Sequence, residues 1–278
     1  MKTFHIASVL FLTCISISAA EPMIVAHRGA SRDAPENTIP AFKLAWEQGA
    51  DAIEGDFLLT KDGHIVCIHD KSTKRFAAVN LPVKGTTLKN LRELDVGIRK
   101  GEKYKGTIIP TISEVFATVP ATKKVFIEIK CGTEIIPPLL DQIAKSSLKK
   151  EQIVVICFNK NVLKEFKYKA PWCKTSWLCS VRKNRSGKLT PSLETVLTAL
   201  REMKADGFSS GKNGISEDFV KGVMDKGYEY HVWTVDDTKT AMRFNKWGAR
   251  SITTNVPAHI KKAIVEQDAT LDADKLRK

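Results

Sequence analysis

Residues 50–56 read Ala-Asp-Ala-Ile-Glu-Gly-Asp, and residues 125–130 read Val-Phe-Ile-Glu-Ile-Lys. Each stretch is a short apolar run of the kind that forms a buried strand, with acidic side chains where further apolar residues are expected. Similar apolar, β-branched runs alternate with longer segments of helical periodicity along the chain. This alternation predicts a parallel α/β fold.

The number of such units narrows the fold class. We expect eight core strands, near residues 23–27, 50–56, 123–129, 152–157, 174–179, 206–209, 228–234 and 250–254. Helical patterns are expected near 38–48, 134–146, 160–167, 191–203, 216–225 and 237–246. Eight βα units in one domain favour a closed (β/α)8 TIM barrel. An open doubly wound sheet is compatible with the same alternation and stays open at this point.

One segment interrupts the alternation after the second strand. Residues 60–63, Thr-Lys-Asp-Gly, carry the Asp-Gly signal of a tight turn, and the apolar run 64–69 follows at once. The sequence therefore predicts a β-hairpin and a small insertion over about residues 57–110. A short helix is expected near 88–94, and a helix over 111–118 leads back to the barrel.

The first 20 residues form a separate segment. Lys2 supplies a positive start, residues 6–17 are apolar, and small residues precede Glu21. This pattern predicts a signal peptide over 1–20, a mature domain over 21–278, and a secreted or periplasmic protein. The apolar run is shorter than the roughly 20 residues of a membrane span, so no stable membrane insertion is expected. A lipoprotein signal at Cys14 is the weaker alternative.

The charge of the chain limits the possible classes of partner. The chain has 44 Lys and Arg against 31 Asp and Glu, a net charge of +13. This excess favours polyanionic partners, phosphorylated substrates or acidic membrane surfaces, although the lysines are spread as on a solvated surface. No nucleic-acid module is present, so no nucleic-acid partner is expected, and the oligomeric state stays open. The charged tail after about Gln267 is expected to fray.

The cysteines that follow the leader are Cys67, Cys131, Cys157, Cys173 and Cys179. Their number is odd, which leaves at least one thiol free in an oxidising compartment. Cys173 and Cys179 are near in sequence, but on one strand their Cα atoms would be too far apart for a disulfide. The sequence leaves that pairing undecided, and the spacings match no zinc site.

Three carboxylates are candidate metal ligands. Glu54 and Asp56 are two residues apart on one strand, so both side chains point to the same face. Glu128 holds the corresponding position on another strand. Buried carboxylates need a counter-charge, and converging oxygen ligands suit Mg²⁺ or Ca²⁺. The alternative is that Arg28 or Lys130 neutralises them in a structural ion network.

Two histidines also end predicted strands. His27 follows residues 24–26, and His69 follows residues 65–68. Imidazole exchanges a proton near neutral pH, as cleavage of a phosphodiester requires at the nucleophile and the leaving oxygen. Arg28 offers a planar fork for phosphate oxygens, and Lys130 offers a point charge on the same face as Glu128.

Several short motifs occur in a fixed order over nearly the whole mature chain. They are His27-Arg28-Gly29-Ala30, Pro35-Glu36-Asn37-Thr38 with Ala41-Phe42, Gly49-Ala50-Asp51 with Glu54 and Asp56, Thr60-Lys61-Asp62-Gly63, His69-Asp70, Leu94-Asp95-Val96-Gly97, Ile109-Pro110-Thr111, Ile127-Glu128-Ile129-Lys130 and Val232-Trp233-Thr234-Val235. This ordered set resembles the signature of the glycerophosphodiester phosphodiesterase family. Any one motif would be weak, but so many in order are specific.

The resemblance implies a (β/α)8 barrel with an insertion after the second strand. It implies that Glu54, Asp56 and Glu128 hold one divalent cation, Mg²⁺ or Ca²⁺. It also implies that His27 and His69 are the general acid and base, in an order that the sequence does not decide. The implied reaction is metal-dependent hydrolysis of a small glycerophosphodiester to glycerol 3-phosphate and an alcohol.

The same resemblance implies a set of residues that bind the substrate. Arg28 would bind the phosphate with support from Lys130. Glu36 and Asn37 match a family motif near the site, where Asn37 would support a ligand or cap a helix. Trp233 would form part of the substrate wall, and plain packing at the barrel top is the alternative for this residue.

Three positions depart from the family pattern. Gly55 stands where a large apolar residue is usual and is expected to loosen the local packing. Cys157-Phe158 stands where Ser-Phe is common, and Thr254-Asn255 where Thr-Asp is common. Because the acidic triad and both histidines are intact, the chemistry is expected to be retained, whereas the substrate preference stays open.

Two other functions remain open from the sequence. One is a related phospholipase C-type or D-type phosphodiesterase that acts on intact lipids. The insertion is polar and basic, which argues against a long-chain lipid at the mouth. The other is a non-catalytic barrel that binds phosphorylated ligands. The complete set of carboxylates and histidines argues against it.

Overall fold

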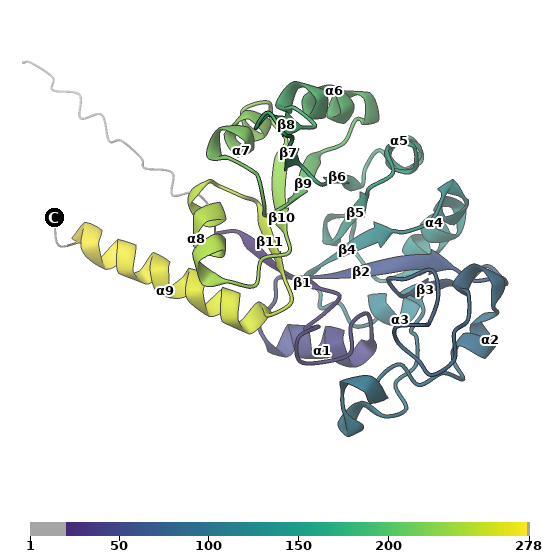
Figure 1. Cartoon of the computed structure of the whole chain (residues 1–278). Helices are drawn as coiled ribbons and strands as arrows, with labels where there is room; N and C mark the ends of the chain where they lie inside the picture. The colour runs from purple at the N-terminus through teal and green to yellow at the C-terminus, as the bar shows by residue number, and fades with distance from the viewer. Residues whose placement is uncertain (1–20, 277–278) are drawn as a thin grey trace, which may run out of the picture.

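The computed structural model describes residues 21–276, and the expected signal peptide lies outside this range. Eight parallel strands form a ring in the order β1-β11-β10-β9-β6-β5-β4-β2, which β1 closes by pairing with β2 (Figure 1). The strands of the ring are β1 (Met23–His27), β2 (Ala52–Leu59), β4 (Lys124–Ile129), β5 (Ile153–Cys157), β6 (Lys174–Cys179), β9 (Gly207–Gly211), β10 (Glu229–Trp233) and β11 (Ser251–Thr254). This closure confirms the TIM barrel and excludes the open sheet.

Helices cover the outside of the ring. They are α1 (Ile39–Glu47), α3 (Ile112–Phe116), α4 (Ile136–Lys145), α5 (Lys160–Lys169), α6 (Leu193–Met203), α7 (Glu217–Met224), α8 (Thr238–Lys246) and α9 (Pro257–Leu276), with the short 3-10 turns η4 (Thr133–Ile135) and η5 (Lys150–Gln152). Six of these helices start on a polar side chain that accepts a backbone hydrogen bond in the first turn: Thr38, Thr111, Asn159, Ser192, Ser216 and Asp237. Such caps fix where each loop at the barrel mouth ends.

Two apolar layers hold the barrel together. The larger lies between strands and helices and includes Phe42, Phe166, Phe208 and Phe244, all fully buried. The smaller lies inside the ring and is built around Phe126, with Val25, Ala52, Val154, Ile156 and Leu178. The ring interior is therefore a packed core, and a ligand can enter only at its open end.

The insertion occupies the connection between β2 and β4. It begins with β3 (Ile65–Cys67), which pairs antiparallel with β2 as the expected hairpin. It continues through η1 (Val83–Gly85), α2 (Leu88–Leu91), η2 (Ile98–Lys100) and η3 (Glu102–Tyr104). Its buried residues, among them Val66, Ile68, Leu91 and Ile109, form a separate cluster against Leu58 of β2. In Figure 1 this blue segment lies beside the barrel at the ends of β2 and β3.

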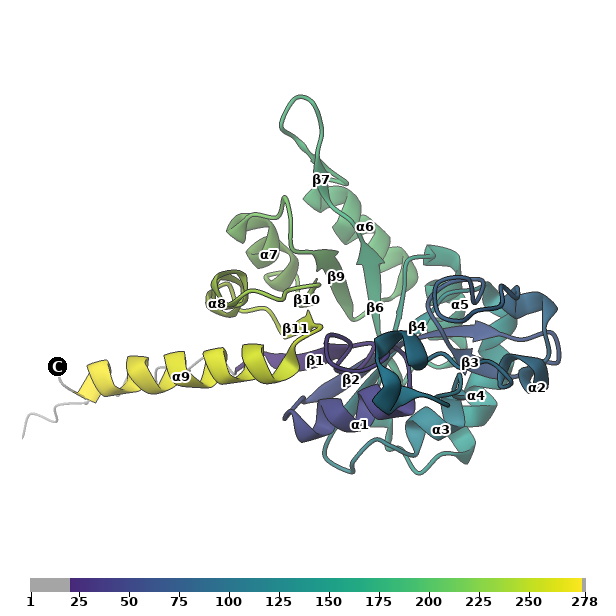
Figure 2. The ribbon, with the colours of Figure 1, turned by 60° about the horizontal axis from the view of Figure 1, so that its bottom comes forward.

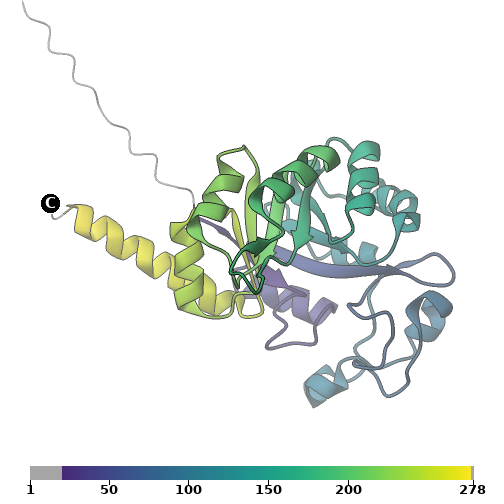
Figure 3. The same cartoon turned by 45° about the horizontal axis from the view of Figure 1, so that its top comes forward.

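Two elements were not expected from the sequence. The hairpin of β7 (Arg182–Lys183) and β8 (Leu189–Thr190) rises away from the barrel in Figure 2. The helix α9 continues through the tail that was expected to fray after Gln267, and it extends away from the barrel (Figure 3).

None of the helices described over residues 21–276 combines the length and the apolar character that a membrane span requires.

All five cysteines of the described region are free thiols. Cys173 is buried and directly precedes β6, whereas Cys179 ends that strand. A strand of this length separates their Cα atoms well beyond the reach of a disulfide, which excludes the pairing left undecided by the sequence.

Candidate active site

The barrel register brings the three candidate carboxylates together. Asp56 on β2 is the Cα partner of Glu128 on β4, and Glu54 is the partner of His27 on β1. The residues Glu54, Asp56 and Glu128 are only 2%, 1% and 8% exposed. One carboxylate oxygen from each lies within 4.8 Å of the others. The three side chains therefore converge at the carboxyl ends of the strands, where barrel sites are built.

Two cations flank this acidic cluster. Arg28 Nε lies 3.0 Å from Asp56 Oδ2, and Lys130 Nζ lies 2.7 Å from Glu128 Oε1 and 3.4 Å from Asp56 Oδ1. The ion network considered as the alternative is thus present. It is incomplete, because Glu54 Oε1 and Asp56 Oδ1 are buried without a hydrogen-bond partner among residues 21–276.

The cluster is electrostatically strained. Burial, followed by the charges of Asp56 and Glu128, raises the pKa of Glu54 well above its usual value. Burial and the Asp56 charge raise the pKa of Glu128 to about 7. Converging oxygens from three carboxylates are the donor set that a hard divalent cation prefers. These residues therefore fit a Mg²⁺ or Ca²⁺ ion, whose charge would relieve the repulsion.

The two predicted histidines have different partners. His27 Nδ1 lies 2.8 Å from Asn255 Oδ1, and His69 Nδ1 lies 2.5 Å from Asp70 Oδ1. Burial and the adjacent Arg28 charge lower the pKa of His27. An oxygen acceptor holds Nδ1 of each ring, which assigns the proton of the neutral ring to Nδ1. Nε2 of each ring has no hydrogen-bond partner among residues 21–276 and can exchange a proton with a ligand.

Asn255 was quoted in the sequence only as a departure from the family pattern. It directly follows β11, which neighbours β1 in the closed ring. Its Nδ2 donates to Asp236 Oδ2 at 2.7 Å, and its backbone N–H donates to Asp236 Oδ1 at 2.8 Å. These bonds orient the amide so that its oxygen faces His27. Asn255 is a polar residue directly after a predicted strand, and this position is the signal by which the sequence could have revealed it as a site residue.

Arg28 is held by its backbone as well as by its side chain. Its φ of 57° is left-handed, and its N–H donates to Glu54 Oε2 at 3.0 Å. Its Nη1 donates to Glu36 Oε1 at 2.9 Å, and both oxygens of Glu36 also accept from Arg75. Such strain is tolerated where surrounding contacts enforce it. Arg75 belongs to the insertion, and its position gave no signal in the sequence.

Glu36 and Asn37 lie behind the site rather than in it. Asn37 is 2% exposed; its Nδ2 donates to Asp56 Oδ2 at 2.8 Å, and its Oδ1 accepts from the Asp56 N–H at 3.1 Å. Neither Glu36 nor Asn37 lines the cavity at the barrel mouth. The structure therefore places them where they support Arg28 and Asp56.

A cavity of about 180 Å³, here called the mouth cavity, lies over the cluster. Its polar wall includes His27, Arg28, Glu54, His69, Glu128 and Lys130. Trp233 and Phe158 form part of its apolar wall, with ring centroids 5.6 Å apart and nearly perpendicular planes. The mouth cavity thus contains the predicted histidines, the predicted phosphate-binding cations and Trp233.

The packing around Gly55 differs from the expectation. A Cβ built on Gly55 would lie 3.0 Å from Cys67 Sγ and 3.3 Å from Phe42 Cζ and Phe57 Cε2. These larger neighbours fill the space that a side chain at position 55 would take. The packing behind the acidic strand is therefore tight, and the expected looseness is wrong.

The fold and the polar groups at its mouth are those of a (β/α)8 barrel enzyme. Comparison with known proteins then defines the family. The model of the glycerophosphoryl diester phosphodiesterase family matches residues 27–259. The chain belongs to the glycerophosphoryl diester phosphodiesterase family.

Individual relatives agree with this assignment. A glycerophosphodiester phosphodiesterase of Caldanaerobacter subterraneus is 36% identical over 241 residues, which cover 84% of this chain and 94% of the relative. A solved phosphodiesterase of Oleispira antarctica, in complex with the product sn-glycerol-3-phosphate, has a TM-score of 0.78 at 25% identity and covers 88% of this chain and 97% of its own. A Thermotoga maritima glycerophosphodiester phosphodiesterase, 24% identical with a TM-score of 0.70, covers 87% of this chain and 98% of its own and shares the fold.

Proposed function

We propose that this protein hydrolyses glycerophosphodiesters to glycerol 3-phosphate and an alcohol, with one divalent cation and two histidines. The observation that carries the proposal is the buried cluster of Glu54, Asp56 and Glu128, whose oxygens lie within 4.8 Å of one another below His27 and His69. Membership of the family and the product-bound Oleispira antarctica relative support the substrate class.

The carboxylate cluster would hold the cation, Mg²⁺ or Ca²⁺. A cation bound there would polarise the phosphoryl oxygens as negative charge builds on them. Arg28 and Lys130 line the same cavity and would bind the remaining phosphate oxygens. Arg28 can do so in a fixed orientation, because Glu36 and Asp56 hold its guanidinium from behind.

The partners of the histidines suggest which is base and which is acid. Asn255 is neutral and adds no charge that would stabilise an imidazolium, so His27 suits the base that deprotonates the nucleophile. His69, whose Nδ1 is held by the Asp70 carboxylate, is then the residue left to protonate the leaving oxygen as the acid. The nucleophile is water or the 2-hydroxyl of the glycerol arm.

Removal of the metal tests the proposal. Treatment with EDTA should abolish hydrolysis of glycerophosphocholine, and added Mg²⁺ or Ca²⁺ should restore it. Intact phosphatidylcholine, offered in parallel, should be hydrolysed far more slowly. Full turnover after exhaustive chelation would rule out the proposed mechanism, and equal turnover of the intact lipid would favour a phospholipase.

We also propose that the protein is exported and cleaved before Glu21, on the basis of residues 1–20. Mass spectrometry of the protein recovered from the culture medium or periplasm should give a chain that begins at Glu21. Recovery of the uncleaved chain from the cytoplasm alone would contradict export.

A further inference from the structure

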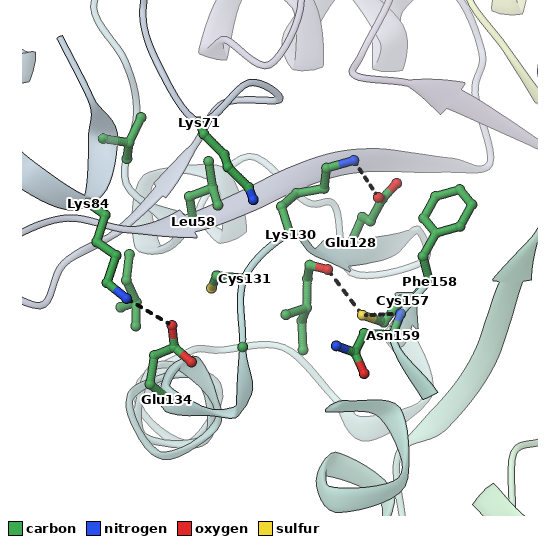
Figure 4. A pocket seen from close by; sticks show the side chains of 14 residues that line it. Leu58, Lys71, Lys84, Glu128, Lys130, Cys131, Glu134, Cys157, Phe158 and Asn159 are labelled. Carbon is green, nitrogen blue, oxygen red and sulfur yellow. Dashed lines mark hydrogen bonds and ion pairs between the residues drawn. The ribbon is translucent and has the colours of Figure 1, made fainter. Parts of the chain in front are cut away.

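A second cavity adjoins the mouth cavity and has no role in the chemistry described above. Its volume is about 510 Å³, and we call it the side cavity. It lies between the insertion, which contributes Lys71 and Lys84, and the loops that follow β4 and β5, which contribute Glu134 and Asn159 (Figure 4). The two cavities share Glu128, Lys130 and Phe158 in their walls.

This arrangement matches the shape of a phosphodiester, which carries two arms on one phosphorus. If the phosphorus lies at the shared wall beside Glu128 and Lys130, one arm enters each cavity. The mouth cavity has apolar walls from Phe126, Ile156 and Leu178 that suit the carbons of a small polyol. The side cavity is then left for the other arm.

The charges of the side cavity indicate the kind of arm it accepts. Lys130 pairs with Glu128 at 2.7 Å, and Lys84 lies 3.9 Å from Glu134. Lys71 remains, and its Nζ has no ion-pair or hydrogen-bond partner among residues 21–276. In Figure 4 the Lys71 side chain extends past Leu58 toward Lys130, over the cavity. The lining thus holds one positive charge in excess.

The same lining is poorly suited to a cationic arm. A quaternary ammonium is usually held by a cage of aromatic rings. Among the described residues that line the side cavity, Phe158 alone is aromatic, and Lys130 Nζ already lies 5.9 Å from the centre of its ring. A trimethylammonium group would therefore meet positive charge where it requires π-electrons.

We propose that the side cavity binds the alcohol arm of the substrate and that Lys71 makes it prefer an arm with its own negative charge, such as a phosphorylated alcohol. This inference rests on the proposed phosphodiesterase function and goes beyond it by defining substrate selectivity. Lys71 acts on the distant end of the arm, so its contribution is to specificity and not to bond cleavage.

The test compares three substrates whose alcohol arms differ in charge. They are glycerophosphocholine, glycerophosphoglycerol and glycerophosphoglycerol phosphate, with cationic, neutral and anionic arms. The wild-type enzyme should give the highest kcat/KM with the anionic arm. Lys71→Glu should lower the ratio of kcat/KM for the anionic arm to that for the cationic arm by about tenfold. The preference should also weaken as salt is raised, because the charges are partly exposed.

Lys74→Glu is the matched control. Lys74 is an exposed lysine three positions further along the same segment, and it lines neither cavity. Lys74→Glu changes the net charge by the same amount as Lys71→Glu. It should leave the ratio of kcat/KM for the anionic arm to that for the cationic arm unchanged. An equal effect of Lys74→Glu and Lys71→Glu, or no effect of Lys71→Glu, would overturn the inference while hydrolysis itself stands. Absence of turnover with all three substrates in the presence of Mg²⁺ or Ca²⁺ would instead overturn the proposed function, and this inference with it.

Discussion

Asn255 Oδ1 lies 2.8 Å from His27 Nδ1, which joins the last strand of the barrel to the first. Asp236 in turn holds the Asn255 amide at 2.7 Å, so a carboxylate orients His27 only through a neutral amide. An amide fixes the ring without adding a full negative charge beside it. The basicity of His27 therefore depends on which of these two positions carries the carboxylate.

Exchange of the two side chains should shift the pH profile. In Asn255→Asp combined with Asp236→Asn, the hydrogen bond remains and the negative charge moves next to His27. The pKa of His27 should rise, so the acidic limb of kcat/KM, where the base becomes protonated, should move to higher pH by about one unit. Asp236→Asn alone keeps a neutral partner at His27 and should leave the limb in place. If the exchange leaves the acidic limb of kcat/KM at the same pH, the residue at position 255 does not set the pKa of His27.

The acidic cluster should make the metal-free protein less stable at higher pH. Burial and Asp56 raise the pKa of Glu128 from 4.5 to about 7 in the folded state. The folded state therefore binds more protons than the unfolded state in this window, and stability is lost as pH rises through it. In EDTA, Glu128→Gln should raise Tm by a few degrees at about pH 8 and have little effect at about pH 5.

Glu134→Gln provides the control for that measurement, because Glu134 lies nearby on η4 but its side chain is 48% exposed. It should leave Tm nearly unchanged at both pH values. Divalent cation should raise the Tm of the wild type more than that of Glu128→Gln. If Glu128→Gln lowers Tm equally at both pH values, the cluster is not repulsive without a cation.

Arg28 should not be replaceable by lysine. Its Nε contacts Asp56 and its Nη1 contacts Glu36, and a single ammonium group cannot reproduce both contacts and present a fork to phosphate. Arg28→Lys should lower kcat/KM by about 100-fold while the circular dichroism spectrum is retained. The control Arg92→Lys alters an arginine that pairs with Glu114 outside both cavities. It should leave kcat/KM nearly unchanged. Comparable kinetics for the two variants would exclude a specific role of the guanidinium.

The tight packing behind the acidic strand makes a further prediction. Gly55→Ala would place a methyl group 3.0 Å from Cys67 Sγ and 3.3 Å from Phe42. Overpacking of this kind typically costs about 1–3 kcal/mol in the free energy of unfolding. The double variant Gly55→Ala with Cys67→Ala should recover part of that loss in denaturant unfolding. If the two substitutions are simply additive, the sulfur is not the obstacle.

Much of the site was predictable because it follows from local periodicity. The period of two in β2 placed Glu54 and Asp56 on one face before any contact was known. The strand-end position of His27 placed it at the carboxyl edge of the barrel. The strand β3 runs antiparallel to β2 and ends at Cys67, so the place of His69 in the mouth cavity follows from the tertiary structure. The hairpin after β2 followed from its Asp-Gly turn.

Other features depend on segments distant in the sequence. Arg75 reaches Glu36 across 39 positions, and His27 meets Asn255 across 228 positions. The periodicity of the sequence gives no information on contacts between residues so far apart along the chain. The hairpin of β7 and β8 and the length of α9 escaped prediction as well, since the sequence of these segments carries no strong apolar pattern.

The sequence by itself determined the alternation of eight strands with helices, the resemblance to the family, the acidic triad and the two candidate histidines, since each follows from short-range spacing and ordered motifs. Only the tertiary structure decided that the ring closes between β1 and β2, that Asn255 orients His27, and that Lys71 lines the side cavity. The physical reason is that burial and alternation act on neighbouring residues along the chain. Hydrogen-bond partners and cavity walls are instead created by chain closure, which brings distant segments to one place.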